Sequence, residues 1–271
     1  MPVISLRPDP ASPIVLAGDD VGLFASDMHL GDHDPATAAA FFGALEAAVR
    51  PASHLFLLGD LFEAWVGDDQ PDAVAADALG LFARITAEGR ALYVMCGNRD
   101  FLLDRLPPGA AAPAGLAAPA GFAVRTGATM LGDPCAAMLF GEPVVLAHGD
   151  ALCTDDREYQ KVREVVRGNA WQTQFLARPL AERLSIAQQL RADSERAKAG
   201  RYIADVNGSA IDEVLRSAGA STMIHGHTHR PACHEWQLDG RTARRWVLPD
   251  WEAATGRGGF LKVDSTGFRR I

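Results

Sequence analysis

Residues 21–29 read VGLFASDMH, an apolar run of strand-forming residues that ends in Asp27 and His29. Polar or charged residues follow four further apolar runs in the same way, at 54–60 (HLFLLGD), 91–100 (ALYVMCGNRD), 144–150 (VVLAHGD) and 221–229 (STMIHGHTH). Two stretches with helical spacing of apolar residues, 36–50 and 72–88, lie between the first three runs. Strands that alternate with helices are typical of an α/β fold with parallel strands.

The part of the chain from 155 to 218 differs because it carries no strand pattern. Apolar spacing predicts three consecutive helices within it, over 159–167, 171–177 and 179–199. Strand patterns return after residue 220, and Asp239-Gly240 predicts a hairpin turn. We therefore expect one α/β domain over 1–271 with a helical insertion at about 155–203.

Composition narrows the class of protein. The chain has 271 residues, of which 48% are hydrophobic, and a net charge of −8, so collagen-like, coiled-coil and disordered classes are excluded. The acidic balance argues against a general nucleic-acid-binding protein. No apolar run reaches the ~18 residues of a membrane-spanning helix, and the first residues lack the pattern of a secretory signal. We therefore expect a cytoplasmic protein whose four cysteines are reduced thiols.

The polar residues that follow the strands predict one shared site, because ligands of α/β sheets bind at the carboxyl ends of the strands. A single Asp-x-His or Gly-Asp pair is a weak signal, since such residues are common in turns. The H-x-H-x-H series at 225–229 is more specific, because His227 and His229 would point to the same side of an extended turn. The candidate ligands are Asp27, His29, Asp60, Asn98, His148, His227 and His229.

The chemistry of these donors indicates the metal. Mixed nitrogen and oxygen ligands without thiolate suit Mn, Fe, Zn or Co better than Ca or a structural zinc site. Seven side chains exceed one tetrahedral shell, which favours two metals that share a carboxylate. Two divalent ions with two carboxylates would leave a positive site that attracts phosphate and acidifies a bound water. The residues therefore predict a dinuclear hydrolase of phosphoesters or phosphoanhydrides.

The ordered motifs D-x-H, GD, GN, H-G-D and GH-x-H resemble those of the calcineurin-like metallophosphoesterases. The longer stretches SDMHLG, LGDLFEAWVGDD, GNRDFLL, HGDALCTDD and HGHTHRP are similar to those of the UDP-2,3-diacylglucosamine hydrolases of the lipid A pathway, over 21–250. The resemblance implies a four-layer α-β-β-α sandwich with a helical lid, and two Mn²⁺ ions. The implied ligand sets are Asp27, His29, Asp60 and His229 for one ion and Asp60, Asn98, His148 and His227 for the other, with Asp60 bridging.

The implied reaction is hydrolysis of UDP-2,3-diacylglucosamine to UMP and 2,3-diacylglucosamine 1-phosphate (lipid X), by water attack on the α-phosphorus. The resemblance also implies that Asn98, Arg99 and His227 are catalytic and contact the substrate. Many phosphomonoesterases of this fold have a histidine where this chain has Arg99. Arginine cannot act as a general acid but can clamp phosphate, which favours a phosphoanhydride whose leaving group needs no proton. The alternative is a structural Arg99 that pairs with Asp100 or Asp104.

Two further functions remain open at this point. One is a metallophosphoesterase of other specificity, such as a nucleotide pyrophosphatase or a cyclic-nucleotide phosphodiesterase. The other is a non-enzymatic scaffold with the same fold, which the presence of all seven candidate ligands disfavours.

The helical insertion bears on the substrate. Residues 157–201 contain ten lysines and arginines against five acidic residues, a local charge of +5, together with apolar residues that include Trp171, Leu180 and Leu184. One alternative is a helical subdomain that buries this stripe in its own core. The other is a basic, apolar lid that takes the acyl chains and touches an anionic membrane. We expect a monomer that is peripheral on the cytoplasmic face of the inner membrane.

The resemblance implies substrate contacts in the insertion at Asp156, Ser194 and a basic residue, either Lys198 or Arg201. Near the C-terminus the chain reads VLPDWE where the family pattern reads VLGAWH, so the role of Asp250 is left open.

Overall fold

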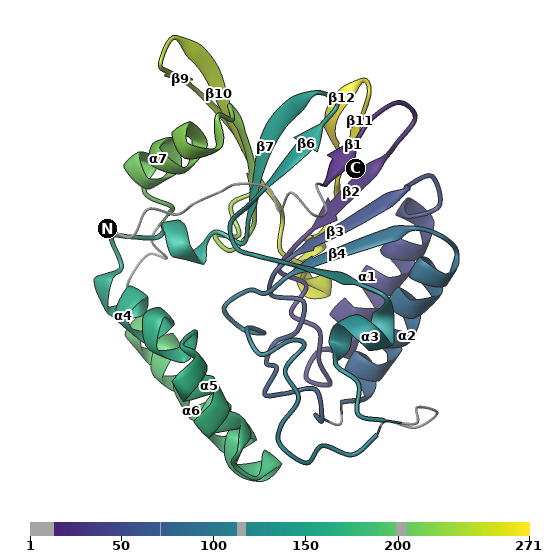
Figure 1. Ribbon diagram of the computed structural model, residues 1–271, viewed down its shortest axis with the longest axis vertical. Coiled ribbons are helices and arrows are strands. Elements are labelled where there is room, and N and C mark those ends of the chain that lie inside the picture. The colour runs from purple at the N-terminus through teal and green to yellow at the C-terminus, as the bar shows by residue number, and fades with distance from the viewer. Residues whose placement is uncertain (1–13, 71, 113–117, 199–204) are drawn as a thin grey trace.

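The computed structural model describes residues 14–70, 72–112, 118–198 and 205–271 (Figure 1). Its α-helices are α1 (Pro35–Ala48), α2 (Ala73–Ala87), α3 (Phe122–Thr126), α4 (Arg157–Val166), α5 (Asn169–Leu176), α6 (Leu180–Lys198) and α7 (Gly208–Ala218). Its strands are β1 (Val15–Leu16), β2 (Gly22–Ala25), β3 (His54–Leu58), β4 (Ala91–Met95), β5 (Thr129–Leu131), β6 (Cys135–Leu139), β7 (Glu142–Ala147), β8 (Thr222–His225), β9 (Cys233–Leu238), β10 (Arg241–Val247), β11 (Leu261–Asp264) and β12 (Gly267–Arg270). None of the described helices is both long and apolar enough to cross a membrane.

The strands form two six-stranded sheets, with the orders β12-β11-β2-β3-β4-β5 and β1-β6-β7-β8-β10-β9. In the first sheet β2, β3, β4 and β5 are parallel, and in the second β7, β8 and β10 are parallel. Parallel neighbours need a long crossover connection, which α1 and α2 supply between β2, β3 and β4. The predicted α/β class is confirmed.

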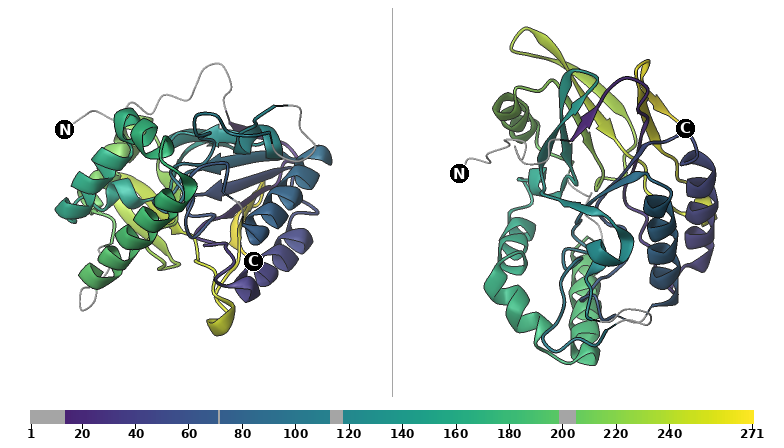
Figure 2. Two further views of the ribbon diagram at one scale, coloured as in Figure 1. Left: turned by 90° about the horizontal axis from the view of Figure 1, so that it is seen from below. Right: turned by 45° about the vertical axis from the view of Figure 1, so that its right-hand side comes forward.

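The two sheets pack face to face, and helices cover their outer faces (Figures 1 and 2). Between the sheets lies a cluster of buried residues in which the rings of Phe24 and Phe56 stack with centroids 4.3 Å apart. A second cluster, which includes Phe41 of α1 and Phe82 of α2, fills the space between these helices and the first sheet. A third, which includes Leu215 of α7, does the same for the second sheet. These layers form the expected α-β-β-α sandwich.

Local signals fix where the first two helices begin. The Asp34 side chain accepts a hydrogen bond from the Thr37 amide at 3.0 Å, and Pro35 occupies the first turn. Asp72 caps α2 in the same way through the Ala75 amide at 2.7 Å. An aspartate at this position satisfies an amide that the helix itself leaves unpaired. The predicted helix starts are therefore confirmed to within one residue.

The prediction lacked four elements: the short β1, β5 and α3, and the 11-residue helix α7. β1 and β5 have only two and three residues, too few for a periodic pattern. α3 begins directly after a stretch rich in proline, alanine and glycine that reads as loop. α7 ends at Gly219, whose φ of 63° is typical of a helix C-terminus. Its apolar spacing was not separated from that of the helical insertion that precedes it in the sequence.

The three predicted helices of the insertion are present as α4, α5 and α6, which lie together beside the sandwich (Figure 2). Their apolar stripe does not form a separate core. Trp171, Leu180 and Leu184 pack against the same cluster that fills the α1–α2 side of the first sheet, and Phe175 belongs to it. The insertion therefore packs on the body of the protein, while Leu190 near its far end stays 44% exposed.

Candidate metal centre

The turns after the strands have an unusual backbone. Five of the seven candidate ligands have positive φ angles: Asp27 (56°), His29 (50°), Asp60 (52°), His227 (66°) and His229 (53°). Residues other than glycine rarely adopt this region, although Asp and His do so more often than most. The backbone strain is retained only where surrounding contacts impose it, which is typical of functional sites.

Hydrogen bonds between neighbouring turns hold this arrangement. The Asp27 amide donates to the Gly59 carbonyl oxygen, and the His29 amide donates to that of Asp60, both at 3.0 Å. The His227 amide donates to the Asp27 carboxylate at 2.9 Å, which ties the turn after β8 to the turn after β2. The sequence pattern therefore folds into one connected group of loops at the ends of strands from both sheets.

Two glycines are required by close approach. A Cβ atom at Gly97 would lie 2.1 Å from Oδ1 of Asp60, and one at Gly226 would lie 2.2 Å from Oδ2 of Asp27. Both distances are far inside van der Waals contact. The glycines of the GN and GH motifs therefore make room for the two carboxylates.

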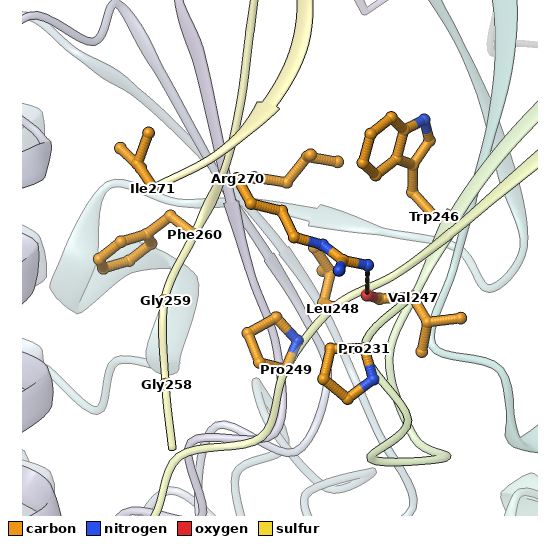
Figure 3. Close-up of a pocket in the computed structure, with 11 residues that line it drawn as sticks. Pro231, Trp246, Val247, Leu248, Pro249, Gly258, Gly259, Phe260, Arg270 and Ile271 are labelled. Atoms are coloured by element: carbon orange, nitrogen blue, oxygen red, sulfur yellow. Dashed lines mark hydrogen bonds between the residues drawn. The ribbon is translucent and has the colours of Figure 1, made fainter. Parts of the chain in front are cut away.

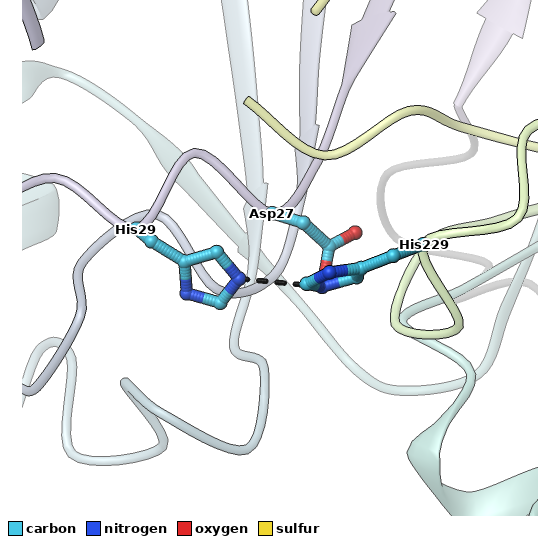
Figure 4. A group of neighbouring side chains, drawn as sticks. All are labelled: Asp27, His29 and His229. Atoms are coloured by element: carbon cyan, nitrogen blue, oxygen red, sulfur yellow. Dashed lines mark hydrogen bonds and ion pairs between the residues drawn. The ribbon is translucent and has the colours of Figure 1, made fainter. Parts of the chain in front are cut away.

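Asp27, His29 and His229 form the first group of converging donors (Figure 4). One ligand atom of each lies within 4.8 Å of the others. Nε2 of His29 lies 3.4 Å from Nε2 of His229, and Nε2 of His229 lies 3.4 Å from Oδ1 of Asp27. Oδ1 of Asp27 is fully buried and has no hydrogen-bond partner among the described residues. A buried carboxylate oxygen that faces two imidazole nitrogens fits a divalent cation.

The second group consists of Asp27, Asp60 and His148, whose ligand atoms also lie within 4.8 Å of one another. Oδ1 of Asp60 lies 3.6 Å from Nε2 of His148, and Oδ1 of Asn98 lies 3.0 Å from the same nitrogen. The ring of His227 stands against that of His148, with centroids 5.1 Å apart. All seven predicted ligands thus lie at one place. Their assignment to two ions, with Asp60 as the bridge, stays a prediction, and Asp27 is the residue common to both groups.

The protonation of the site reflects this crowding of carboxylates and imidazoles. Burial lowers the pKa of His148, but the charges of Asp60 and Asp27 outweigh it and raise the pKa to about 9. Burial also opposes the charged form of His229, while its contacts with Asp250 and Asp27 raise the pKa to about 10. Burial and the neighbouring charge of His148 lower the pKa of His227 to about 4. The carboxylates therefore hold protons on two imidazoles of the metal-free site.

Arg99 has an acidic partner that the sequence analysis did not consider. Its Nη1 lies 2.9 Å from Oε1 of Glu63. Asp100 is buried and accepts hydrogen bonds from the backbone amides of Gly97 and Leu61, both at 2.6 Å. Its carboxylate is therefore used to fix the two loops that carry Asn98 and Asp60. The Arg99 amide donates to Oδ1 of Asp60 at 2.8 Å, which places this arginine beside the centre.

Of the predicted substrate contacts in the insertion, only Asp156 can be placed. Asp156 is exposed at the start of α4 and accepts a hydrogen bond from the Tyr159 amide at 3.1 Å. The side chains of Ser194 and Lys198, and all of Arg201, lie outside the described residues. Their roles stay predictions.

The sequence analysis missed a buried network that fixes α4 to the site. Asp150 accepts hydrogen bonds from the Tyr159 hydroxyl at 2.6 Å and from Nε of Arg163 at 2.7 Å. Arg167 donates to the Gly97 carbonyl oxygen at 2.9 Å, next to Asn98. Residues 159, 163 and 167 are four apart and share one helix face, so their spacing was the available signal. The Tyr159 ring also stacks near His227, with centroids 6.3 Å apart.

Comparison with curated proteins identifies the family. The chain is 42% identical over 251 residues to a UDP-2,3-diacylglucosamine hydrolase of Chromohalobacter salexigens, covering 92% of this chain and 95% of that protein. It is 43% identical to the one of Bordetella pertussis, over 90% of this chain and 92% of that protein, and 45% identical to the one of Aeromonas hydrophila, over 84% and 90%. The chain belongs to the UDP-2,3-diacylglucosamine hydrolase family. The family resemblance seen in the motifs is confirmed.

Comparison with protein-family models and with solved structures adds little to this identification. No protein-family model matches the sequence. A crystal structure of a cold-active protein-tyrosine phosphatase of a Shewanella species is similar at a TM-score of 0.47 and 14% identity, covering 96% of this chain and 80% of that one.

A separate pocket of about 230 Å³ lies near the C-terminus of the hydrolase (Figure 3). Trp246, Leu248, Phe260 and Ile271 are among its lining residues, and none of the seven candidate ligands lines it. The pocket is therefore not part of the candidate metal centre.

Metal binding by this hydrolase is expected to release about two protons per chain at pH 7.5. His148 and His229, with pKa values raised to about 9 and about 10, are protonated there in the metal-free protein, and a cation binds only the neutral imidazole. Affinity should therefore fall as the pH is lowered. Calorimetric titration with Mn²⁺ in two buffers of different ionisation enthalpy measures this release. Equal apparent enthalpies in both buffers would contradict it.

Proposed function

We propose that the protein hydrolyses the diphosphate of UDP-2,3-diacylglucosamine to UMP and 2,3-diacylglucosamine 1-phosphate, with water attacking the α-phosphorus. The observation that carries the proposal is the pair of donor groups that share Asp27, within a chain of this family. The proposed cofactor is two divalent ions, most simply Mn²⁺, held by the seven candidate ligands. Bound ions of this kind supply an activated water and neutralise phosphate charge.

The residues of the chain bind and orient the diphosphate around those ions. Arg99 extends from the loop that carries Asn98, and its backbone amide is fixed on Asp60. Its guanidinium offers a rigid fork of donors that matches two phosphate oxygens. Because arginine stays protonated, it stabilises charge on the leaving phosphate without transferring a proton. Asn98 and His227, which both contact His148, complete the proposed contacts to the reacting phosphate.

Replacing Arg99 with histidine is expected to lower kcat/KM on the diphosphate by roughly a hundred-fold, because the clamp on charged oxygens is lost. The same variant gains an acid able to protonate an alkoxide, so weak activity on an alkyl phosphomonoester such as glycerol phosphate should appear. Rates on both substrates measure the two effects. An unchanged rate on the diphosphate would remove Arg99 from the catalytic residues.

We further propose that α4, α5 and α6 form a lid over the site within a single domain spanning 1–271, the lid covering about 155–203. Val162 and Val165 of α4 are 51% and 57% exposed, among the charged side chains of Arg157 and of Lys161, which pairs with Glu158. An exposed apolar helix face among charged residues suits the interface of a lipid surface. On this basis the protein is a cytoplasmic monomer that is peripheral on the inner membrane and collects its acylated substrate there.

The proposed function is tested by UMP release from UDP-2,3-diacylglucosamine, with UDP-N-acetylglucosamine as the unacylated control. The proposal predicts metal-dependent release from the acylated substrate and little from the control. Equal rates on both, or a preference for small nucleotides, would favour a nucleotide pyrophosphatase instead.

A further inference from the structure

Three of the four imidazoles of the candidate metal centre, those of His29, His148 and His229, share an orientation. Nδ1 of His29 lies 3.3 Å from Oε2 of Glu63, and Nδ1 of His229 lies 3.3 Å from Oδ2 of Asp250. Nδ1 of His148 lies 3.0 Å from the carbonyl oxygen of Leu58. In each ring Nδ1 therefore faces an oxygen acceptor outside the centre, while Nε2 faces the other candidate ligands.

This orientation determines which nitrogen of each ring carries the proton. A neutral imidazole carries its proton on one nitrogen and a lone pair on the other. An oxygen acceptor at Nδ1 holds the proton there and leaves the Nε2 lone pair for a cation. Nδ1 of His29 is buried and makes no aligned hydrogen bond to a described residue, so its 3.3 Å contact with Oε2 of Glu63 is the one that would hold its proton.

The two carboxylates are themselves held in place. The side chains of Glu63 and Asp250 are only 11% and 4% exposed. Oε1 of Glu63 accepts from Nη1 of Arg99 at 2.9 Å, and Oδ2 of Asp250 lies 2.9 Å from Nη2 of Arg257. A buried carboxylate with a cationic partner is held in its position by charge-assisted hydrogen bonds.

We infer that Glu63 and Asp250 are positioning residues that set the tautomer and the ring orientation of His29 and His229, so that both Nε2 atoms are directed at one cation. Through its second oxygen Glu63 also holds Arg99, so one carboxylate orients a metal ligand and the proposed phosphate clamp together. The inference rests on the proposed metal centre, and it gives Asp250 of the PDWE sequence a role beside the centre.

The test is the affinity of the metal-free protein for Mn²⁺, measured by competition with a chelator and without substrate. Glu63→Ala and Asp250→Ala should each weaken binding by about 10- to 100-fold. Glu63→Gln and Asp250→Asn retain an oxygen acceptor and should lose only a few-fold, about 2–5. Glu235→Ala is the matched control, since this carboxylate is exposed and pairs with Arg244 at the sheet edge. Melting curves for each variant check that the fold is kept.

A second measurement covers the case in which an alanine variant does not fold. Imidazole ¹⁵N spectra of the wild-type protein loaded with Zn²⁺ should show His29 and His229 protonated at Nδ1 and metal-bound at Nε2. Binding through Nδ1 in either ring, or wild-type affinity in both alanine variants, would overturn the inference while leaving the proposed function intact. Failure of the wild-type protein to bind Mn²⁺ would instead count against the proposed metal centre itself.

Discussion

Replacing Asp60 with alanine is expected to lower turnover of the diphosphate by roughly a thousand-fold or more, because bound metals contribute several kcal/mol to catalysis. Asp60 is 2% exposed, lies 3.6 Å from His148 and accepts the Arg99 amide. Its loss removes a predicted ligand of both ions and leaves two cations with less neutralising charge. UMP release and metal content of the purified variant measure the effect.

A matched control for this variant is Asp239→Ala, which removes an exposed aspartate that pairs with Arg216 far along the chain. It should retain both activity and metal. Two tightly bound ions in Asp60→Ala, with activity near wild type, would contradict the assignment. Because Asp27 belongs to both donor groups, Asp27→Ala should be compared in the same assay. Loss of both ions in the Asp27 variant and of one ion in the Asp60 variant would identify Asp27 as the bridge.

Replacing Arg183 with alanine is expected to destabilise the protein by about 1.5–3 kcal/mol, because it removes the charge-assisted hydrogen bonds of a buried guanidinium. Arg183 of α6 is 2% exposed, and its Nη1 donates to Asp69 at 2.9 Å, in the loop between β3 and α2. The same guanidinium donates to the Val66 carbonyl oxygen. This pair attaches the proposed lid to the body, so α6 should become the first site of proteolytic cleavage.

Denaturant unfolding and limited proteolysis of the variant measure both effects. The control is Arg178→Ala, because Arg178 precedes the same helix but pairs with Glu182 at 47% exposure, where an ion pair contributes about 0–1 kcal/mol. Equal stability of the two variants would show that the Arg183–Asp69 pair does not attach α6. Hydrolysis of a small phosphodiester should persist in the Arg183 variant if the lid alone is released.

The sequence predicted the strand ends and the seven candidate ligands because each depends on local pattern. An apolar run of about five residues followed by Asp, Asn or His can be recognised from the sequence alone, as at 54–60 and 144–150. The residues that contact the candidate ligands from outside the centre could not be predicted in this way. Glu63 reaches His29 because β2 and β3 are neighbours in the first sheet, and Asp250 reaches His229 because β8 and β10 are neighbours in the second. These pairings come from the strand order, which the sequence does not show. The Trp251 amide donates to the Asp27 carbonyl oxygen and so joins the turns of the two sheets.

The pairing of Arg99 illustrates the same limit. Asp100 and Asp104 are near it in sequence, but backbone amides occupy them: Asp100 binds those of Gly97 and Leu61, and Asp104 accepts from Ala123 at 3.0 Å. The apolar stripe of the insertion was equally ambiguous. Helical spacing fixes which face is apolar but not what covers it, and the structure packs much of that face on the body of the protein.

Hydrolysis of UDP-2,3-diacylglucosamine in ¹⁸O-labelled water, with mass spectrometry of both products, tests most directly which phosphorus is attacked. Metal-dependent water attack on the α-phosphorus predicts that the label appears in UMP and not in 2,3-diacylglucosamine 1-phosphate, and only when the protein carries its metal. Label in the sugar phosphate, or the same rate of UMP release after the metal is stripped, would contradict it.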